Sequence, residues 1–232
     1  MDGGKTALIV GAGRGLSASL ARLLAAEGFR VALASRNAEK LSSLKDEIKG
    51  LALRCDATVA AQVEDAFVAV EKKWGVPDLV IYNAGFRTRG PLTELKAEEV
   101  RKTLEICAFG GFLVAQAAAK RMLARGSGAI FFTGASASVK GYANSAPFAM
   151  GKFALRGLAQ SMARELSPKN IHVAHFVIDG GIRAGNDARA GERGEDGMLL
   201  PDEIARSYLD VYRQHRSAWA WELELRPWVE KF

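Results

Sequence analysis

Residues 128–166 contain the side chains best placed to do chemistry. An apolar strand is expected at residues 129–133, followed by a loop of small residues and a long helix that carries Phe148 and Lys152 one turn apart. A lysine on an otherwise apolar helix face is costly to bury unless it binds something. A strand that opens into a small-residue loop before a helix is typical of a site at the carboxyl edge of an α/β sheet. We therefore expect a functional site there that includes Lys152.

A glycine-rich turn follows the first expected strand, residues 6–10. It runs Gly-Ala-Gly-Arg-Gly-Leu-Ser from Gly11 to Ser17, and leucines at helical spacing come after it. Glycines let the backbone turn sharply and approach a pyrophosphate, while the free N–H groups at the helix start bind it. The sequence therefore predicts a dinucleotide site whose cofactor contacts include Gly11, Gly15 and Leu16.

The end of the second expected strand, residues 29–34, bears on the choice of cofactor. An NAD site usually has an acid here for the ribose 2′-hydroxyl, but this chain has Ser35 and Arg36, and Arg14 lies within the glycine turn. A guanidinium can hold a 2′-phosphate through two parallel hydrogen bonds. We therefore predict NADP(H) in preference to NAD(H), with Arg14 and Arg36 as its ligands. The alternative is that both arginines are solvated loop residues.

Polar and small residues follow the next two expected strands. Asp56 comes directly after the third, and Asn83, Ala84 and Gly85 come directly after the fourth. The carboxyl ends of parallel strands are where the adenine and ribose of a dinucleotide lie. These four residues are therefore predicted to bind the cofactor. Alternatively, Asp56 and Asn83 cap turns.

The alternation of strands and helices over the 232 residues predicts one α/β domain, a Rossmann-like doubly wound parallel sheet of seven strands in the order 3-2-1-4-5-6-7. The apolar residues 97–124 predict a long buried helix. The polar, glycine-containing residues 183–198 predict a mobile loop, either a substrate lid or a disordered segment. The alternating residues 219–232 predict the last strand.

Composition excludes several classes of function. The net charge is +6, but lysine and arginine are scattered and form no run with interleaved aromatics, so nucleic-acid binding is not expected. There is no signal-like amino end and no apolar run of the roughly 20 residues that a membrane helix needs. Cys55 and Cys107 lack the spacing of a metal or redox site. We expect a cytoplasmic protein with no membrane partner and no metal.

Together, these motifs resemble the short-chain dehydrogenase/reductase family over nearly the whole chain. The resemblance rests on the glycine turn, Asp56, the Asn-Ala-Gly sequence and the helix around Lys152. It implies that Lys152 binds the nicotinamide ribose and acts in catalysis. It also implies a homodimer or homotetramer formed through the helices at residues 107–124 and 145–166, and cofactor contact by Ile182 after the sixth strand.

The catalytic positions depart from the family pattern of Asn, Ser, Tyr and Lys. The resemblance aligns Phe148 with the tyrosine, Ala135 with the serine and Cys107 with the asparagine. Phenylalanine has no proton to transfer, and general acid catalysis contributes about 10²–10⁴-fold. Ser136 is the predicted substitute, acting with Lys152 or through a water that both hold.

Other groups near this position could also donate a proton. Ser138, Tyr142 and a carboxyl of raised pKa at Asp179 are each a candidate, and each also has a structural interpretation as a loop, surface or turn residue. Two functions remain. The first is an NADP(H)-dependent oxidoreductase acting on an unidentified carbonyl or alcohol with a non-standard site. The second is a catalytically degenerate cofactor-binding or interaction protein on the same fold.

Overall fold

A seven-stranded parallel sheet forms the middle layer of the computed structural model, which describes residues 4–185 and 189–230. Its strand order is β3-β2-β1-β4-β5-β6-β7, and every neighbouring pair is parallel, which confirms the prediction. The strands are Thr6–Val10 (β1), Arg30–Ser35 (β2), Leu51–Arg54 (β3), Leu79–Tyr82 (β4), Gly128–Thr133 (β5), Ile171–Ile178 (β6) and Glu222–Leu225 (β7).

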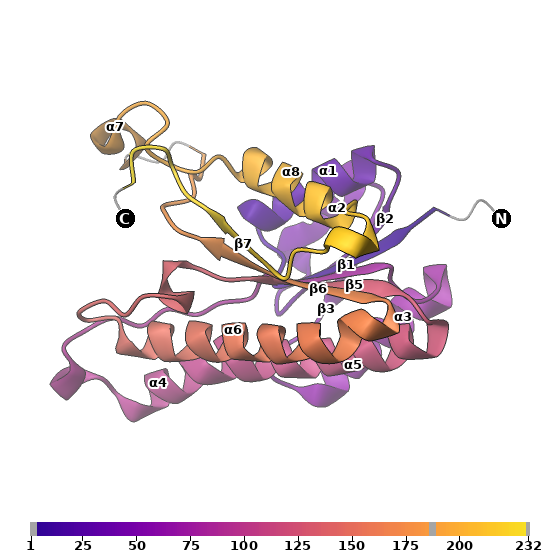
Figure 1. Ribbon diagram of the computed structural model, residues 1–232, viewed down its shortest axis with the longest axis horizontal. Coiled ribbons are helices and arrows are strands. Elements are labelled where there is room, and N and C mark those ends of the chain that lie inside the picture. Colours follow the sequence, from indigo (N-terminus) through magenta and orange to yellow (C-terminus); the bar gives the residue numbers. More distant parts are fainter. Residues whose placement is uncertain (1–3, 186–188, 231–232) are drawn as a thin grey trace.

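Helices cover both faces of the sheet (Figure 1). Helices α1, α2 and α8 lie on one face, and α3, α4, α5 and α6 lie on the other. The helices are Leu16–Ala26 (α1), Ser42–Glu47 (α2), Ala60–Trp74 (α3), Ala97–Leu104 (α4), Gly110–Arg125 (α5), Ala146–Leu166 (α6), Arg189–Arg193 (α7) and Pro201–Tyr212 (α8). The two-sided cover explains why the central strands are continuous apolar runs with no polar face.

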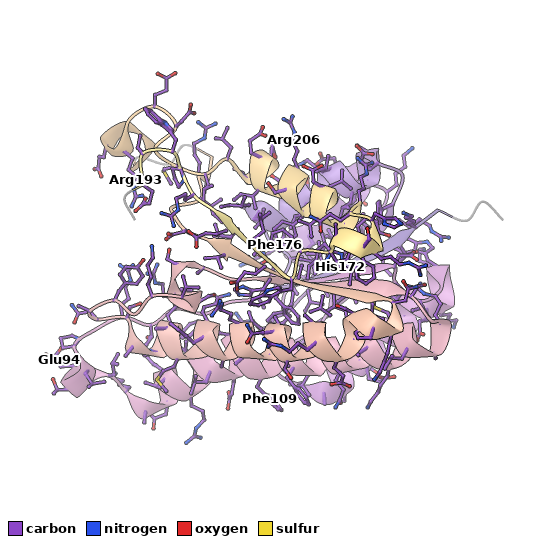
Figure 2. The ribbon with its side chains drawn as sticks, viewed as in Figure 1. Glu94, Phe109, His172, Phe176, Arg193 and Arg206 are labelled. Carbon is purple, nitrogen blue, oxygen red and sulfur yellow. The ribbon has the colours of Figure 1, made fainter. Side chains whose placement is uncertain are left out.

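Two apolar cores lie on opposite sides of the sheet because successive side chains of a strand point to opposite faces. On β6, Val173 belongs to the core under α5 and α6, while Phe176 belongs to the core under α1 and α8. Phe176 stacks on Tyr208 of α8 with 3.6 Å between ring centroids. Figure 2 shows Phe176 within the interior, where it helps fix β6 beneath α8.

The long helix predicted at residues 97–124 forms, but a π-helical segment at Glu105–Phe109 separates α4 from α5. A Cβ at Gly110 would lie only 2.5 Å from Tyr82 Oη, so a small residue lets α5 pack closely on β4. Among the described residues, Ala97–Arg125 is the one helical stretch long and apolar enough to span a membrane, with mean hydropathy 1.3, and half of its most apolar window is buried. Such burial is typical of a core helix.

Two other segments differ from the sequence prediction. The sequence predicts one polar helix over residues 38–49, whereas the structure has a 3₁₀ turn at Glu39–Leu41 before the shorter α2. Within the predicted mobile loop, α7 forms, and an isolated bridge joins Ile182 to Leu199. Residues 186–188 lie outside the described residues, and the mobility of the loop stays a prediction.

Candidate functional site

Two adjoining clefts open at the carboxyl edge of the sheet, and Asn83 and Gly85 line both. The first, of about 230 Å³, lies over the ends of β1, β2 and β3, and the second, of about 400 Å³, lies over β5 and β6. The predicted site residues in the first cleft are Gly11, Arg36, Asp56, Asn83, Ala84 and Gly85. Those in the second are Asn83, Gly85, Ser136, Lys152 and Ile182.

The glycine turn is bound tightly to the segment after β4. Gly11 has φ +85°, and a Cβ there would lie 2.3 Å from the Ala84 backbone nitrogen, so only glycine fits this approach. The Ser17 hydroxyl donates to the Gly11 carbonyl at 3.1 Å and accepts from the Asn83 amide at 2.7 Å. Asn83 therefore fixes the turn as well as lining both clefts, and the Ser17 hydroxyl links Asn83 to the Gly11 carbonyl.

The start of α1 is open to a ligand. Gly15 precedes Leu16 at the first helical position, and no side chain caps the helix. A Cβ built at Gly13 or Gly15 would meet nothing within 4 Å. The helix therefore presents its partial positive charge and its first N–H groups to open space, which is the arrangement that binds a pyrophosphate.

The two arginines predicted to bind a 2′-phosphate are both exposed. Arg36 lines the first cleft, whereas Arg14 lies on the glycine turn outside its lining. Within residues 4–185 and 189–230, neither side chain makes a hydrogen bond or ion pair with another residue. Both guanidinium groups therefore keep their donors for a ligand.

Asp56 both caps a turn and lines the first cleft, which are the two roles that the sequence allowed. Its Oδ1 accepts hydrogen bonds from the Thr58 backbone N–H at 3.0 Å and the Thr58 hydroxyl at 2.7 Å, so it caps a turn. Burial raises the pKa of Asp56, but these hydrogen bonds and the Arg36 charge outweigh it and hold the pKa below its usual value. The carboxylate therefore stays charged at the wall of the first cleft, where it can accept a hydrogen bond from a ligand.

Lys152 lies at the junction of the clefts. Its side chain is 4% exposed, and its Nζ donates to the Thr133 carbonyl at 2.7 Å. The Nζ also lies 4.0 Å from the position of a Cβ at Gly85. Burial lowers the pKa of Lys152. Among the described residues, the Thr133 carbonyl is thus the one acceptor of the ammonium, which lines a cleft in which a ligand can supply others.

Phe148 occupies the wall of the second cleft beside two cations. The Arg87 guanidinium lies 5.0 Å from its ring centroid, and the Lys152 Nζ lies 5.8 Å from it. Cys107, in the π-helical segment, is fully buried, and its thiol contacts the backbone of Phe86. Cys107 lines neither cleft, so it acts as a packing residue.

The proposed carboxyl of raised pKa is wrong for Asp179. It is 3% exposed, and its Oδ2 lies 2.8 Å from Lys140 Nζ and 3.1 Å from Arg226 Nη2. Burial alone would raise the pKa of Asp179, but hydrogen bonds from Lys140 and Ser136 and the charge of Arg226 hold it below its usual value. Asp179 is therefore an anion balanced by cations, and it has no proton to give near neutral pH.

A buried chain of polar groups supports the loop after β5. Ser138 Oγ accepts from the Ala135 backbone N–H at 3.1 Å and lies 3.3 Å from His175 Nε2. His175 Nδ1 lies 3.1 Å from Glu222, which forms two hydrogen bonds with Arg156. Burial lowers the pKa of His175 to about 4. Ser138 is thus a positioning group within this chain and not a proton donor at the cleft.

Comparison with known proteins identifies the family. The family model described as short chain dehydrogenase matches residues 5–192. The chain belongs to the short-chain dehydrogenase family. This is a family of oxidoreductases, and the membership confirms the resemblance drawn from the sequence.

Three relatives illustrate the match. A short-chain dehydrogenase from Rhodopseudomonas palustris is 38% identical, with a TM-score of 0.85 over 97% of this chain and 99% of that one. The 3-oxoacyl-[acyl-carrier-protein] reductase MabA of Mycobacterium tuberculosis is 31% identical over 84% of this chain and 76% of its own. A metagenomic short-chain oxidoreductase in complex with NADP is 28% identical, with a TM-score of 0.82 over 96% and 97% of the two chains.

Sequence reasoning missed Arg87 and the counterions of Asp179. Arg87 follows the Asn-Ala-Gly sequence in a loop with no periodicity. Its side chain contacts Phe148, but no sequence motif contains both residues. Lys140 and Arg226 reach Asp179 from other segments. A count of cations in the loops at the sheet edge is the one signal that would have singled them out.

Proposed function

We propose that this protein is an NADP(H)-binding oxidoreductase that acts on a carbonyl or alcohol with a non-standard catalytic site. The observation that carries the proposal is the continuity of the two clefts, with the glycine turn beside one and Lys152 at the junction with the other. A dinucleotide would extend from the uncapped start of α1 to Lys152. A nicotinamide bound there would donate a hydride to a carbonyl or accept one from an alcohol.

The residues of the first cleft fit such a cofactor. Gly11, Gly15 and Leu16 would hold the pyrophosphate, Asp56 and the segment from Asn83 to Gly85 the adenosine, and Lys152 and Ile182 the nicotinamide half. Arg36, exposed at the rim of the first cleft and without a hydrogen bond or ion pair among the described residues, would bind a 2′-phosphate together with Arg14. The metagenomic relative in complex with NADP supports the same choice.

Phe148 alters how a proton reaches the substrate. Because it cannot donate one, Ser136 and Lys152 would hold a water in the second cleft, which both line. Lys152 has a pKa lowered by burial, so it gives up a proton more readily than an exposed lysine. We expect turnover below that of a family member with the usual tyrosine by about 10²–10⁴-fold.

The test begins with calorimetric titration of the purified protein with NADPH and NADH. We expect micromolar binding of NADPH and at least about tenfold weaker binding of NADH, about 1.4 kcal/mol. Arg36→Asp should remove the preference for NADPH over NADH. The control is Arg206→Asp, at an exposed position on α8, which should retain that preference. Binding of neither cofactor would refute the proposal.

Turnover distinguishes the enzyme from a degenerate cofactor-binding or interaction protein on the same fold. Ketones, aldehydes and alcohols would be screened with NADPH or NADP⁺. Activity that Lys152→Ala abolishes supports the enzyme. Cofactor binding without activity across the panel would favour the degenerate cofactor-binding or interaction protein. The observation that favours this second function is that Phe148 and Ala135 stand at the positions of the family's tyrosine and serine.

The assembly that we propose is a homodimer or homotetramer. Phe109 of the π-helical segment, Phe112 of α5 and Phe153 of α6 are 50%, 40% and 44% exposed, and the first two line a groove of about 410 Å³. Figure 2 shows Phe109 projecting away from the sheet. Helices of two subunits that pack here would bury these rings. A monomer in light scattering at micromolar concentration would contradict the assembly, and a cytoplasmic location remains a prediction.

A further inference from the structure

The second cleft has an unbalanced charge. Its lining contains the cations Arg87 and Lys152 and, among the residues that the structure describes, no carboxylate. Its other polar side chains are those of Asn83, Ser136 and Tyr142, which carry no charge at neutral pH. The cleft where a substrate would lie is therefore positive.

Arg87 lies against an aromatic ring and has no counterion among the described residues. Its guanidinium lies 5.0 Å from the Phe148 ring centroid. Burial and the neighbouring Arg89 charge both lower the pKa of Arg87, which indicates a site that disfavours a cation lacking an anionic partner. Within the described part of the chain, no carboxylate lies within ion-pair distance of Arg87. A guanidinium resting on an aromatic ring still presents its edge donors to a ligand.

The acids around the second cleft are already engaged. Asp179 is paired with Lys140 and Arg226. Glu99, on the helix that follows the Arg87 loop, accepts a hydrogen bond from the Thr88 hydroxyl at 2.7 Å. Neither acid forms an ion pair with Arg87, so in the part of the chain that the structure describes the guanidinium is left to pair with the anion of a ligand.

We propose that the substrate carries a carboxylate, and that Arg87 binds it against the face of Phe148. The inference rests on the proposed function, because it names the substrate class of the same cleft. A planar carboxylate accepts two parallel hydrogen bonds from the guanidinium edge. At position 148, a ring without a hydroxyl gives the guanidinium an apolar surface to rest on, and Arg87 then sets specificity by orienting the substrate toward Lys152 and Ser136.

The test measures binding to the full chain saturated with NADP⁺, so that turnover is not needed. The probes are phenylpyruvate, its amide and phenyl phosphate, each titrated by calorimetry. We expect the acid to bind at least tenfold more tightly than the amide, about 1.4 kcal/mol. Tighter binding of phenyl phosphate than of the acid would overturn the carboxylate assignment, and equal binding of acid and amide would overturn the role of charge.

Variants assign the effect to Arg87. Arg87→Gln should abolish the difference between acid and amide, and Arg87→Lys should leave a reduced difference because it keeps the charge and loses the paired donors. Arg89→Gln is the matched control and should retain the full difference between acid and amide. If Arg87→Gln does not fold, the lysine variant decides, and an unchanged preference in it would refute paired hydrogen bonding by Arg87.

The same titrations distinguish failure of the proposed function from failure of the proposal on Arg87. NADP⁺ affinity is measured first in each protein and should be unchanged in Arg87→Gln. Absence of cofactor binding would refute the proposed function. In that case the acid and amide are compared on the protein without cofactor, and their difference decides the proposal on Arg87.

Discussion

Restoring a phenol at position 148 should produce a tyrosine of unusually low pKa. Phe148→Tyr places a hydroxyl on a ring whose centroid lies 5.8 Å from the Lys152 Nζ and 5.0 Å from the Arg87 guanidinium. With the 5.8 Å distance to the ring centroid taken as the charge separation and an effective dielectric constant of about 20, the Lys152 charge stabilises the phenolate by about 3 kcal/mol, or about 2 pKa units. Solvent screens the exposed Arg87, so we count only Lys152 and expect a pKa of about 8 instead of about 10.

Ultraviolet difference absorbance measures tyrosinate directly, and the native tyrosines interfere little. Burial raises the pKa values of Tyr82 and Tyr208 above their usual range and that of Tyr212 to about 12. Tyr142 is exposed, so the titration is best done in a Tyr142→Phe background.

Lys152→Met in the same background removes the nearby charge and should return the pKa of the new phenol toward 10 or above. A pKa near 10 with Lys152 present, or one that Lys152→Met leaves unchanged, would refute the electrostatic reasoning. The Phe148→Tyr variant should also gain carbonyl reduction by up to about 10²–10⁴-fold, because a general acid has been restored.

Three further changes test the site and its support. Burial lowers the pKa of His175 to about 4; the unfolded chain therefore binds more protons between pH 4 and 6.5, and the free energy of unfolding should fall by about 2 kcal/mol from pH 7 to pH 5. Urea denaturation should show a smaller fall in His175→Asn than in the native protein; a residual fall is expected because burial also lowers the pKa of His172. Gly11→Ala should destabilise the fold by about 3 kcal/mol through strain and overpacking, while Gly13→Ala, with open space around it, should melt like the native protein. Lys152→Met should keep or raise the melting temperature without cofactor, since it removes a buried cation, yet weaken NADPH binding at least tenfold; equal affinity would contradict its assignment as a cofactor ligand.

Much of the fold was predictable from local pattern. The strand order followed from apolar runs that alternate with helices, because parallel strands joined by right-handed crossovers leave few topologies. The same order brings the ends of β1, β3 and β4 together, so the positions of Gly11, Asp56 and Asn83 at one cleft followed as well. The π-helical segment was not predictable, since its apolar residues also fit an ordinary helix.

Charge balance at the second cleft was decided by tertiary contacts. Asp179 meets Lys140 from 39 positions away, and His175 meets Glu222 from 47 positions away. The local sequence around Asp179 allowed a raised pKa as well as a lowered one, because the sign depends on which cations reach it.

By itself, the sequence determined the family, the sheet and the loss of the phenol at position 148, because these depend on residue type and short-range periodicity. Only the tertiary structure decided that Arg87 lies against Phe148 and that Asp179 is already neutralised. Long charged side chains project from loops with no periodicity, and their partners are chosen by proximity in the folded chain. Since electrostatic energy depends on distance and burial, the charge character of the site appears only once the chain is folded.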